Sequence, residues 1–128
     1  YLNNKNGTFT EVAIQARCNV TGVIKGVNAG DFNNDGLQDI IVSGYEGKVL
    51  LKNKGVNATN IPQFENATFS SKMDDLNGQG ITFGTWFWDY DNDGWLDIYV
   101  NGYGTNNEVA AYSAKDALEL ETNCTELY

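Results

Sequence analysis

Two short acidic stretches carry the residues with the clearest chemistry. Residues 89–97 place aspartate at the first, third, fifth and ninth positions, with glycine at the sixth, and residues 31–39 repeat this spacing with one asparagine. Ca²⁺ takes about six to eight oxygen ligands, and crowded carboxylates are unfavourable unless a cation neutralises them. We therefore predict two calcium sites. Their ligands are the side chains of Asp31, Asn33, Asp35 and Asp39 with the carbonyl of Leu37, and the side chains of Asp89, Asp91, Asp93 and Asp97 with the carbonyl of Trp95.

The two loops differ in charge at the third position. Asn33 offers a neutral oxygen where Asp91 offers a charged one, so we expect the first site to bind calcium more weakly. Gly36 and Gly94 occupy the sixth position, where the turn needs a backbone conformation that glycine adopts readily.

Two alternatives compete with this interpretation. An EF-hand loop ends in a bidentate glutamate at position 12 and continues into a helix. Here position 12 is Val42 or Val100, and both loops run into β-branched and aromatic residues that favour a strand. Acidic surface turns without metal are also common, because Asp-Gly and Asn-Asp are turn dipeptides. Two copies with the same ligand spacing make that explanation the weaker one.

The loop pattern, followed by a hydrophobic strand and glycine, resembles the FG-GAP/VCBS repeats that form the blades of integrin-α-like β-propellers. Residues 3–13 resemble the segment that joins blades in the cartilage-acidic-protein-like branch of these repeats. The resemblance covers most of residues 1–103 and implies an all-β fold with structural calcium.

An internal repeat supports this resemblance. The two loops align at an offset of 58 residues, and a period near 60 suits a four-stranded blade with long loops. We expect two four-stranded antiparallel β-propeller-type blades with calcium-binding loops, in residues 1–50 and 51–128. Residues 104–128 diverge from the pattern and predict an irregular or short helical insertion.

The strands are expected on either side of each loop. The predicted segments are residues 24–30, 39–43, 48–53, 81–88 and 97–101, and Pro62 is expected to end any strand near it. In residues 81–88, alternation places Phe83, Thr85 and Phe87 on one face and Trp86 and Trp88 on the other. These aromatics suit packing between blades, which we favour over a sugar-stacking platform.

Composition excludes several functions. A chain of 128 residues suffices for one domain, and its net charge of −9 argues against nucleic acid as a partner. No apolar run is long enough to span a membrane. The chain has no histidine, which removes the commonest general base and the ligands of most zinc sites, so we expect no catalysis. It also shows no signal peptide, so we expect a secreted protein to be a mature or trimmed product.

Several features favour an extracellular or cell-surface location. Five sites match the N-glycosylation motif, where composition alone gives roughly two, and these are Asn6, Asn19, Asn57, Asn66 and Asn123. Cys18 and Cys124 are expected to form a disulfide in an oxidising compartment, with separate thiols or pairing to another chain as alternatives.

Two blades would leave two hydrophobic flanks, because repeat units do not bury their faces alone. Residues 125–128 resemble the first half of a strand that links two blades, and residues 1–5 resemble its second half. The chain thus begins and ends at about the same position within the repeat. We expect either a piece of a longer propeller or copies joined head to tail in a ring or filament. The predicted function is a calcium-stabilised extracellular structural or adhesion module. The alternative is a calcium-dependent glycan-binding module, with exposed Trp86 or Trp95 beside an ion.

Overall fold

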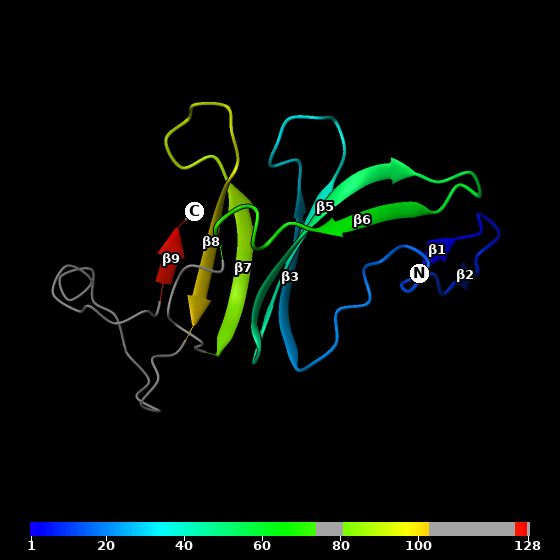
Figure 1. Cartoon of the computed structure of the whole chain (residues 1–128), viewed down its shortest axis with the longest axis horizontal. Helices are drawn as coiled ribbons and strands as arrows, with labels where there is room; N and C mark the ends of the chain where they lie inside the picture. The colour runs from blue at the N-terminus through cyan, green and yellow to red at the C-terminus, as the bar shows by residue number, and fades with distance from the viewer. Residues whose placement is uncertain (74–80, 103–124, 128) are drawn as a thin grey trace, which may run out of the picture.

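The computed structural model describes residues 1–73, 81–102 and 125–127, the last three by their backbone alone. The all-β prediction is confirmed, because every regular element in these residues is a strand (Figure 1). No helix in this part of the chain has the length and apolarity needed to cross a membrane. The strands are β1 (Leu2–Asn3), β2 (Phe9–Thr10), β3 (Ile24–Gly30), β4 (Asp39–Gly44), β5 (Gly47–Val56), β6 (Pro62–Asn66), β7 (Thr82–Trp88), β8 (Asp97–Gly102) and β9 (Thr125–Leu127).

The strands form one hairpin and two larger sheets. β1 pairs with β2, β3 to β6 form a four-stranded antiparallel meander, and β7, β8 and β9 form a three-stranded antiparallel sheet. The first meander has the four strands expected of a blade, whereas the described residues supply three strands to the second sheet. The expected division between residues 50 and 51 falls inside β5, which is one continuous strand paired on both sides. The expected insertion in residues 104–124 lies outside the described residues.

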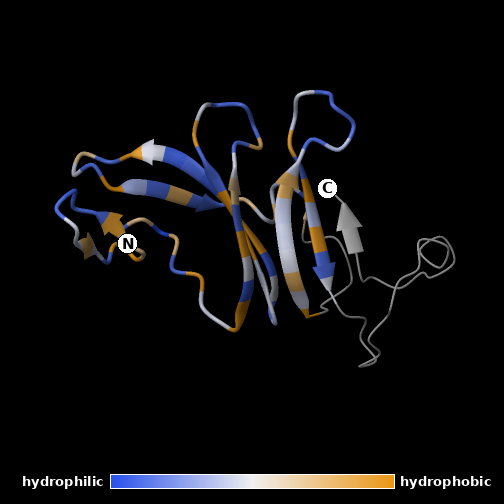
Figure 2. Cartoon of the chain, turned by 180° about the vertical axis from the view of Figure 1, so that it is seen from behind, coloured by the Kyte–Doolittle hydropathy of each residue, from blue (hydrophilic) through white to orange (hydrophobic). Residues whose placement is uncertain are grey.

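β4 forms the centre of the first sheet because its sequence is apolar on both faces. Ile41, Val42 and Ser43 are all buried, and β4 is flanked by β3 and β5. A short continuous apolar run between turn residues is typical of such a fully enclosed strand. Figure 2 shows hydrophobic and hydrophilic segments interspersed along the strands, whereas the two projecting loops are mainly hydrophilic.

The strand boundaries around Pro62 differ from the prediction. Pro62 begins β6 rather than ending a strand, and it pairs with Val56 beside a register shift in β5. Proline lacks an N–H to donate to the ladder, but the first residue of an edge strand does not need one.

Two hydrophobic clusters pack on opposite faces of the four-stranded sheet. The cluster between the two sheets contains Ile41, Leu50, Ala67, Met73, Ile98 and Val100, with Phe32 and Phe87 against it. The cluster on the other face contains Ala16, Leu51 and Phe64, with Cys18, Val20, Ile40, Val49 and Ile61 against it.

A compact turn covers each of these clusters, and the two turns have the same backbone. In residues 12–18, the N–H of Ala16 bonds to the carbonyl of Val12 at 2.7 Å. In residues 67–73, the N–H of Ser71 bonds to the carbonyl of Ala67 at 2.9 Å. Arg17 and Lys72 take the same left-handed conformation, with φ of 58° and 59°. The sequence repeat is therefore also a repeat in three dimensions.

The two larger sheets meet along β3 and β7, which lie side by side (Figure 1). A Cβ at Gly30 would lie 2.7–2.9 Å from ring atoms and Cβ of Phe87, so glycine is what lets the strands approach. Asn28 Oδ1 accepts a hydrogen bond from the N–H of Phe87 at 3.1 Å, and the Ser43 hydroxyl donates to the carbonyl of Phe83 at 2.9 Å. These contacts fix the relative position of the two sheets.

Candidate metal centre

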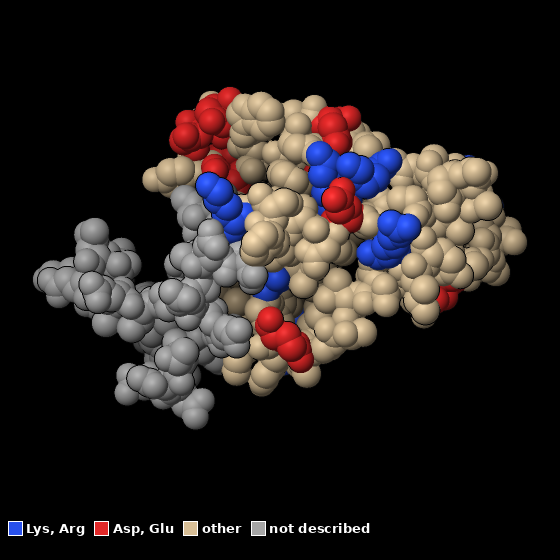
Figure 3. Space-filling model, viewed as in Figure 1, with Lys and Arg blue, Asp and Glu red and all other residues tan. Residues whose placement is uncertain are grey.

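The two predicted calcium loops connect β3 to β4 and β7 to β8, and both project from the same edge of the molecule (Figure 1). They touch each other, because Asn34 Nδ2 donates to the carbonyl of Gly94 at 3.1 Å. Acidic side chains gather along this edge, above all over the loop between β7 and β8 (Figure 3).

The first loop folds around its own carboxylates. The Asp31 carboxylate accepts the N–H groups of Asp35 at 3.0 Å and Gly36 at 2.8 Å. Asn33 Oδ1 accepts the N–H of Asp35 at 3.2 Å, and Asp35 Oδ1 accepts the N–H of Leu37 at 3.0 Å. Side-chain oxygens thus replace the backbone partners that a strand would give these N–H groups.

The second loop repeats every one of these bonds. The Asp89 carboxylate accepts the N–H groups of Asp93 and Gly94, both at 3.1 Å. Asp91 Oδ1 accepts the N–H of Asp93 at 3.2 Å, and Asp93 Oδ1 accepts the N–H of Trp95 at 2.8 Å. Two loops 58 residues apart therefore share one hydrogen-bonded frame.

The backbone conformation also repeats. Asn34 and Asn92 have φ of 53° and 59°, and Gly36 and Gly94 have φ of 83° and 89°. Asparagine tolerates the left-handed region, and glycine enters it without strain. The pair of left-handed residues therefore gives the two loops the same bend.

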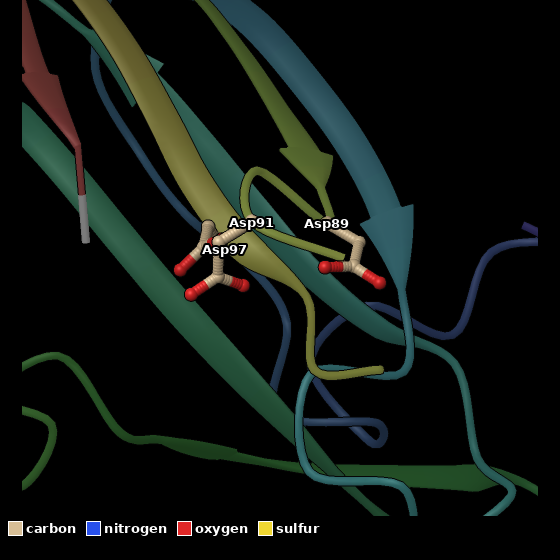
Figure 4. A group of neighbouring side chains, drawn as sticks. All are labelled: Asp89, Asp91 and Asp97. Atoms are coloured by element: carbon tan, nitrogen blue, oxygen red, sulfur yellow. The ribbon is translucent and has the colours of Figure 1, made fainter. Parts of the chain in front are cut away.

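Three carboxylates converge in the second loop (Figure 4). Oxygens of Asp89, Asp91 and Asp97 all lie within 4.8 Å of one another. Two ligands on opposite sides of one Ca²⁺ are about 4.8 Å apart, since each bond is about 2.4 Å long. One calcium ion therefore fits among these three residues. Asp93, the fourth predicted side chain, is not one of this group, and its Oδ1 accepts the N–H of Trp95.

The first loop differs at the third position. Asn33 Oδ1 makes the bond that Asp91 Oδ1 makes in the second loop, so Asn33 Nδ2 corresponds to the second oxygen of Asp91. Within the described residues, this Nδ2 is buried without a hydrogen-bond partner. An amide nitrogen cannot coordinate a cation here, so the first loop offers one side-chain ligand atom fewer in this conformation.

The ninth residue of each loop closes the turn. Asp39 and Asp97 accept the N–H groups of Phe32 and Tyr90, at 3.2 Å and 2.9 Å. Asp39 is fully buried, and its other oxygen accepts the N–H of Asn53 at 2.7 Å. Burial raises the pKa of Asp39 above its ordinary 3.8, and the nearby Asp35 and Asp31 charges add to that effect, while the two backbone hydrogen bonds oppose it. A bound cation would favour the charged form.

Asn53 is the residue of this site that the sequence analysis missed. The N–H of Asn53 donates to Asp39 Oδ1 at 2.7 Å, and Asn53 Oδ1 accepts the N–H of Gly55 at 2.9 Å. Asn3 occupies the matching place in the hairpin of β1 and β2, where its Oδ1 accepts the N–H of Lys5 at 2.8 Å. The recurrence of an asparagine two residues before a turn was the available signal.

The exposed aromatics follow the predicted alternation along β7. Thr85 is buried and Phe87 packs in the core between the sheets, whereas Trp86 and Trp88 face away from it. Trp86 stacks on Tyr99 with ring centroids 4.2 Å apart. Trp95, in the second loop, is 54% exposed.

The glycosylation and disulfide residues stay predictions. The sequon residues in the described part of the chain are all exposed, namely Asn6, Asn19, Asn57 and Asn66, and Asn123 lies outside it. Cys18 carries a free thiol and is partly buried against the second cluster. Its predicted partner Cys124 also lies outside the described residues.

Comparison with known proteins identifies part of the chain. Residues 1–42 match the family model of the FG-GAP-like repeat. The match runs from the β1–β2 hairpin through the first acidic loop and into β4, so it includes the predicted ligands from Asp31 to Asp39. No curated protein and no solved structure matches the chain.

Proposed function

Because residues 1–42 form an FG-GAP-like repeat, we propose that the chain is a calcium-binding β-propeller-type module with an extracellular structural or adhesion role. One observation carries the calcium assignment. The two acidic loops share a hydrogen-bonded frame, and three carboxylates of the second converge within the span of a single ion.

The role of the ion follows from the charge of the loops. Seven of the acidic residues lie in the two loops, in a chain of net charge −9, and two Ca²⁺ ions offset four of those charges. A cation that binds only the folded loops stabilises the fold, by about 2.7 kcal/mol at a hundredfold excess over Kd. The ion joins the end of one strand to the start of the next, which makes its role structural.

An extracellular location suits this chemistry. Extracellular modules bind calcium with Kd values of about 10⁻⁴–10⁻³ M, and the millimolar calcium outside cells suits modest-affinity loops of this kind. The exposed sequons at Asn6, Asn19, Asn57 and Asn66 support N-linked glycans, and a Cys18–Cys124 disulfide belongs to the same proposal. The partners are other proteins, further blades or copies of the chain.

Calcium titration tests the proposal. We expect isothermal titration calorimetry to give two ions per chain and the melting temperature to rise in calcium relative to EDTA. Magnesium is the control, because it prefers a smaller octahedral shell with retained waters. Asp89→Asn should remove the tighter of the two binding events. A melting temperature equal in calcium and EDTA would contradict a structural role for the ion.

A calcium-dependent glycan-binding role is the second candidate. Trp95 lies in the second loop between Asp91 and Asp97 of the carboxylate cluster and is 54% exposed, which suits stacking on a sugar ring beside an ion. A glycan array with and without calcium tests it. Trp95→Ala should then abolish glycan binding while leaving the calcium stoichiometry unchanged. We propose no reaction for this chain, which has no histidine to act as a general base.

A further inference from the structure

The contact between the two sheets has a defined size pattern. The front face of the first sheet is the side of β3 that carries Gly26, Asn28 and Gly30, and it contacts the back face of the second sheet, which carries Thr85 and Phe87. Small residues on the front face thus receive a large ring from the back face. The Phe87 ring fills the space that a side chain at Gly30 would need.

The repeat allows the two outward faces to be compared with this contact. At the offset of 58 residues, Asn28 and Gly30 correspond to Trp86 and Trp88, which lie on the front face of the second sheet. In the same way, Phe87 corresponds to Ala29, on the back face of the first sheet. The size pattern is therefore reversed on the outward faces, with large residues in front and small residues behind.

This reversal restricts what each outward face can accept. Another copy of the second sheet cannot dock on the front face of the second sheet, because Phe87 would meet Trp88 where it now meets Gly30. The back face of a first sheet can dock there, because it presents Ala29 to the indole.

Residues on the back face of the first sheet are also more exposed than their equivalents around the second sheet. Val27 is 66% exposed, whereas Thr85 at the equivalent position is 6% exposed in the contact between sheets. Cys18 is partly buried, whereas Met73 at the equivalent position of the other turn is 2% exposed. The turn of residues 12–18 already covers this face as residues 67–73 cover the other, so only the adjoining sheet is lacking.

We propose that the front face of the second sheet docks on the back face of the first sheet of a second copy, with Trp86 and Trp88 against Val27 and Ala29. The contact is heterologous, so it leaves one free face at each end and continues into a ring or filament. This inference rests on the proposed function, in which the chain is a repeat module. To that function it adds the two surfaces that meet and a second copy of the chain as the partner. It also requires first and second sheets to alternate along the assembly.

Complementary variants test the proposal on the full 128-residue chain in calcium. Light scattering should show the unmodified chain associating with rising concentration. Trp86→Ser combined with Trp88→Ser removes the front face, and Ala29→Trp blocks the back face, so each variant alone should be monomeric. Each keeps one intact face, so their mixture should form a dimer of one copy of each and grow no further. Val56→Ser, at an exposed position at the end of β5 rather than in β3 or β7, should associate like the unmodified chain.

Calorimetry on the same samples separates this inference from the calcium proposal. Both monomeric variants should still bind two calcium ions, because the substituted residues are not ligands. A monomeric unmodified chain would overturn the inference and leave the calcium proposal standing, and so would full association of Ala29→Trp. Loss of calcium binding in the unmodified chain would instead contradict the proposed function.

Discussion

Asn33 and Asp91 occupy the same position in two loops with the same backbone, so they form a matched pair for testing ligand charge. Asn33→Asp adds a charged oxygen to the first loop in place of an unpartnered nitrogen, and Asp91→Asn does the reverse in the second. We expect the first substitution to lower the Kd of its site about tenfold and the second to raise it about tenfold, which is roughly 1.4 kcal/mol each.

Calcium titrations of the two variants, with terbium luminescence sensitised by Trp95 to identify the second site, measure these changes. The doubly substituted chain is the internal control, since its total ligand charge equals that of the unmodified chain. If each substitution shifts both sites equally, net charge rather than coordination explains the effect.

The shared geometry of the two loops was largely predictable because their residues repeat at fixed spacing. The aspartates, Gly36 and Gly94 belong to the pattern, and the structure gives both loops one hydrogen-bond frame. Asn53 was not predicted, because its bond to Asp39 depends on the register between β4 and β5 rather than on the loop. The bond between Asp93 Oδ1 and the N–H of Trp95 is likewise a matter of local geometry.

At the scale of elements, β3 has the predicted bounds because Gly30 and the acidic loop mark its end clearly. β5 extends to Val56, three residues beyond the prediction, and β6 starts at Pro62. The glycine and proline there indicated a turn, but the hairpin accommodates Gly55 with a φ of 82° and a shift in register. Turn residues predict that a chain reverses, and tertiary pairing decides how far the strands continue.

The contact between β3 and β7 predicts a specific coupling. Gly30→Ala places a Cβ against the Phe87 ring, so it should lower the free energy of unfolding by about 1–3 kcal/mol. In a Phe87→Ala background the same substitution should cost much less, because the Cγ and Cδ2 atoms that the new Cβ would meet are gone. Urea denaturation of the four proteins of this double-mutant cycle measures the difference.

Gly36→Ala is the control for that cycle, since nothing lies within 4 Å of its Cβ and its cost comes from its φ of 83°. Its destabilisation should be the same with Phe87 or Ala at position 87. Equal costs of Gly30→Ala in both backgrounds would mean that the strands separate to admit the methyl group.

At the scale of the whole molecule, the repeat predicted that equivalent residues exist but not which faces meet. Gly30 and Phe87 are far apart in sequence, and their contact follows only once β3 and β7 lie side by side. The structure shows that the core between the sheets takes residues from both, including Ile41 and Val100. The two sheets therefore stabilise each other.

The seven aspartates of the two loops, which lie at one edge of the molecule, make stability depend on salt in opposite ways with and without calcium. Without calcium the loop carboxylates repel one another in the folded state, and salt screens that repulsion, since the Debye length falls from about 30 Å at 0.01 M to about 3 Å at 1 M. We therefore expect sodium chloride to raise the melting temperature in EDTA. With calcium bound the repulsion is already neutralised, and salt weakens the attraction between ion and loop, so the melting temperature should fall or stay level. Calorimetric melts across a salt series in both conditions measure the two slopes, and equal slopes would show that the loops do not bind the ion in the folded state.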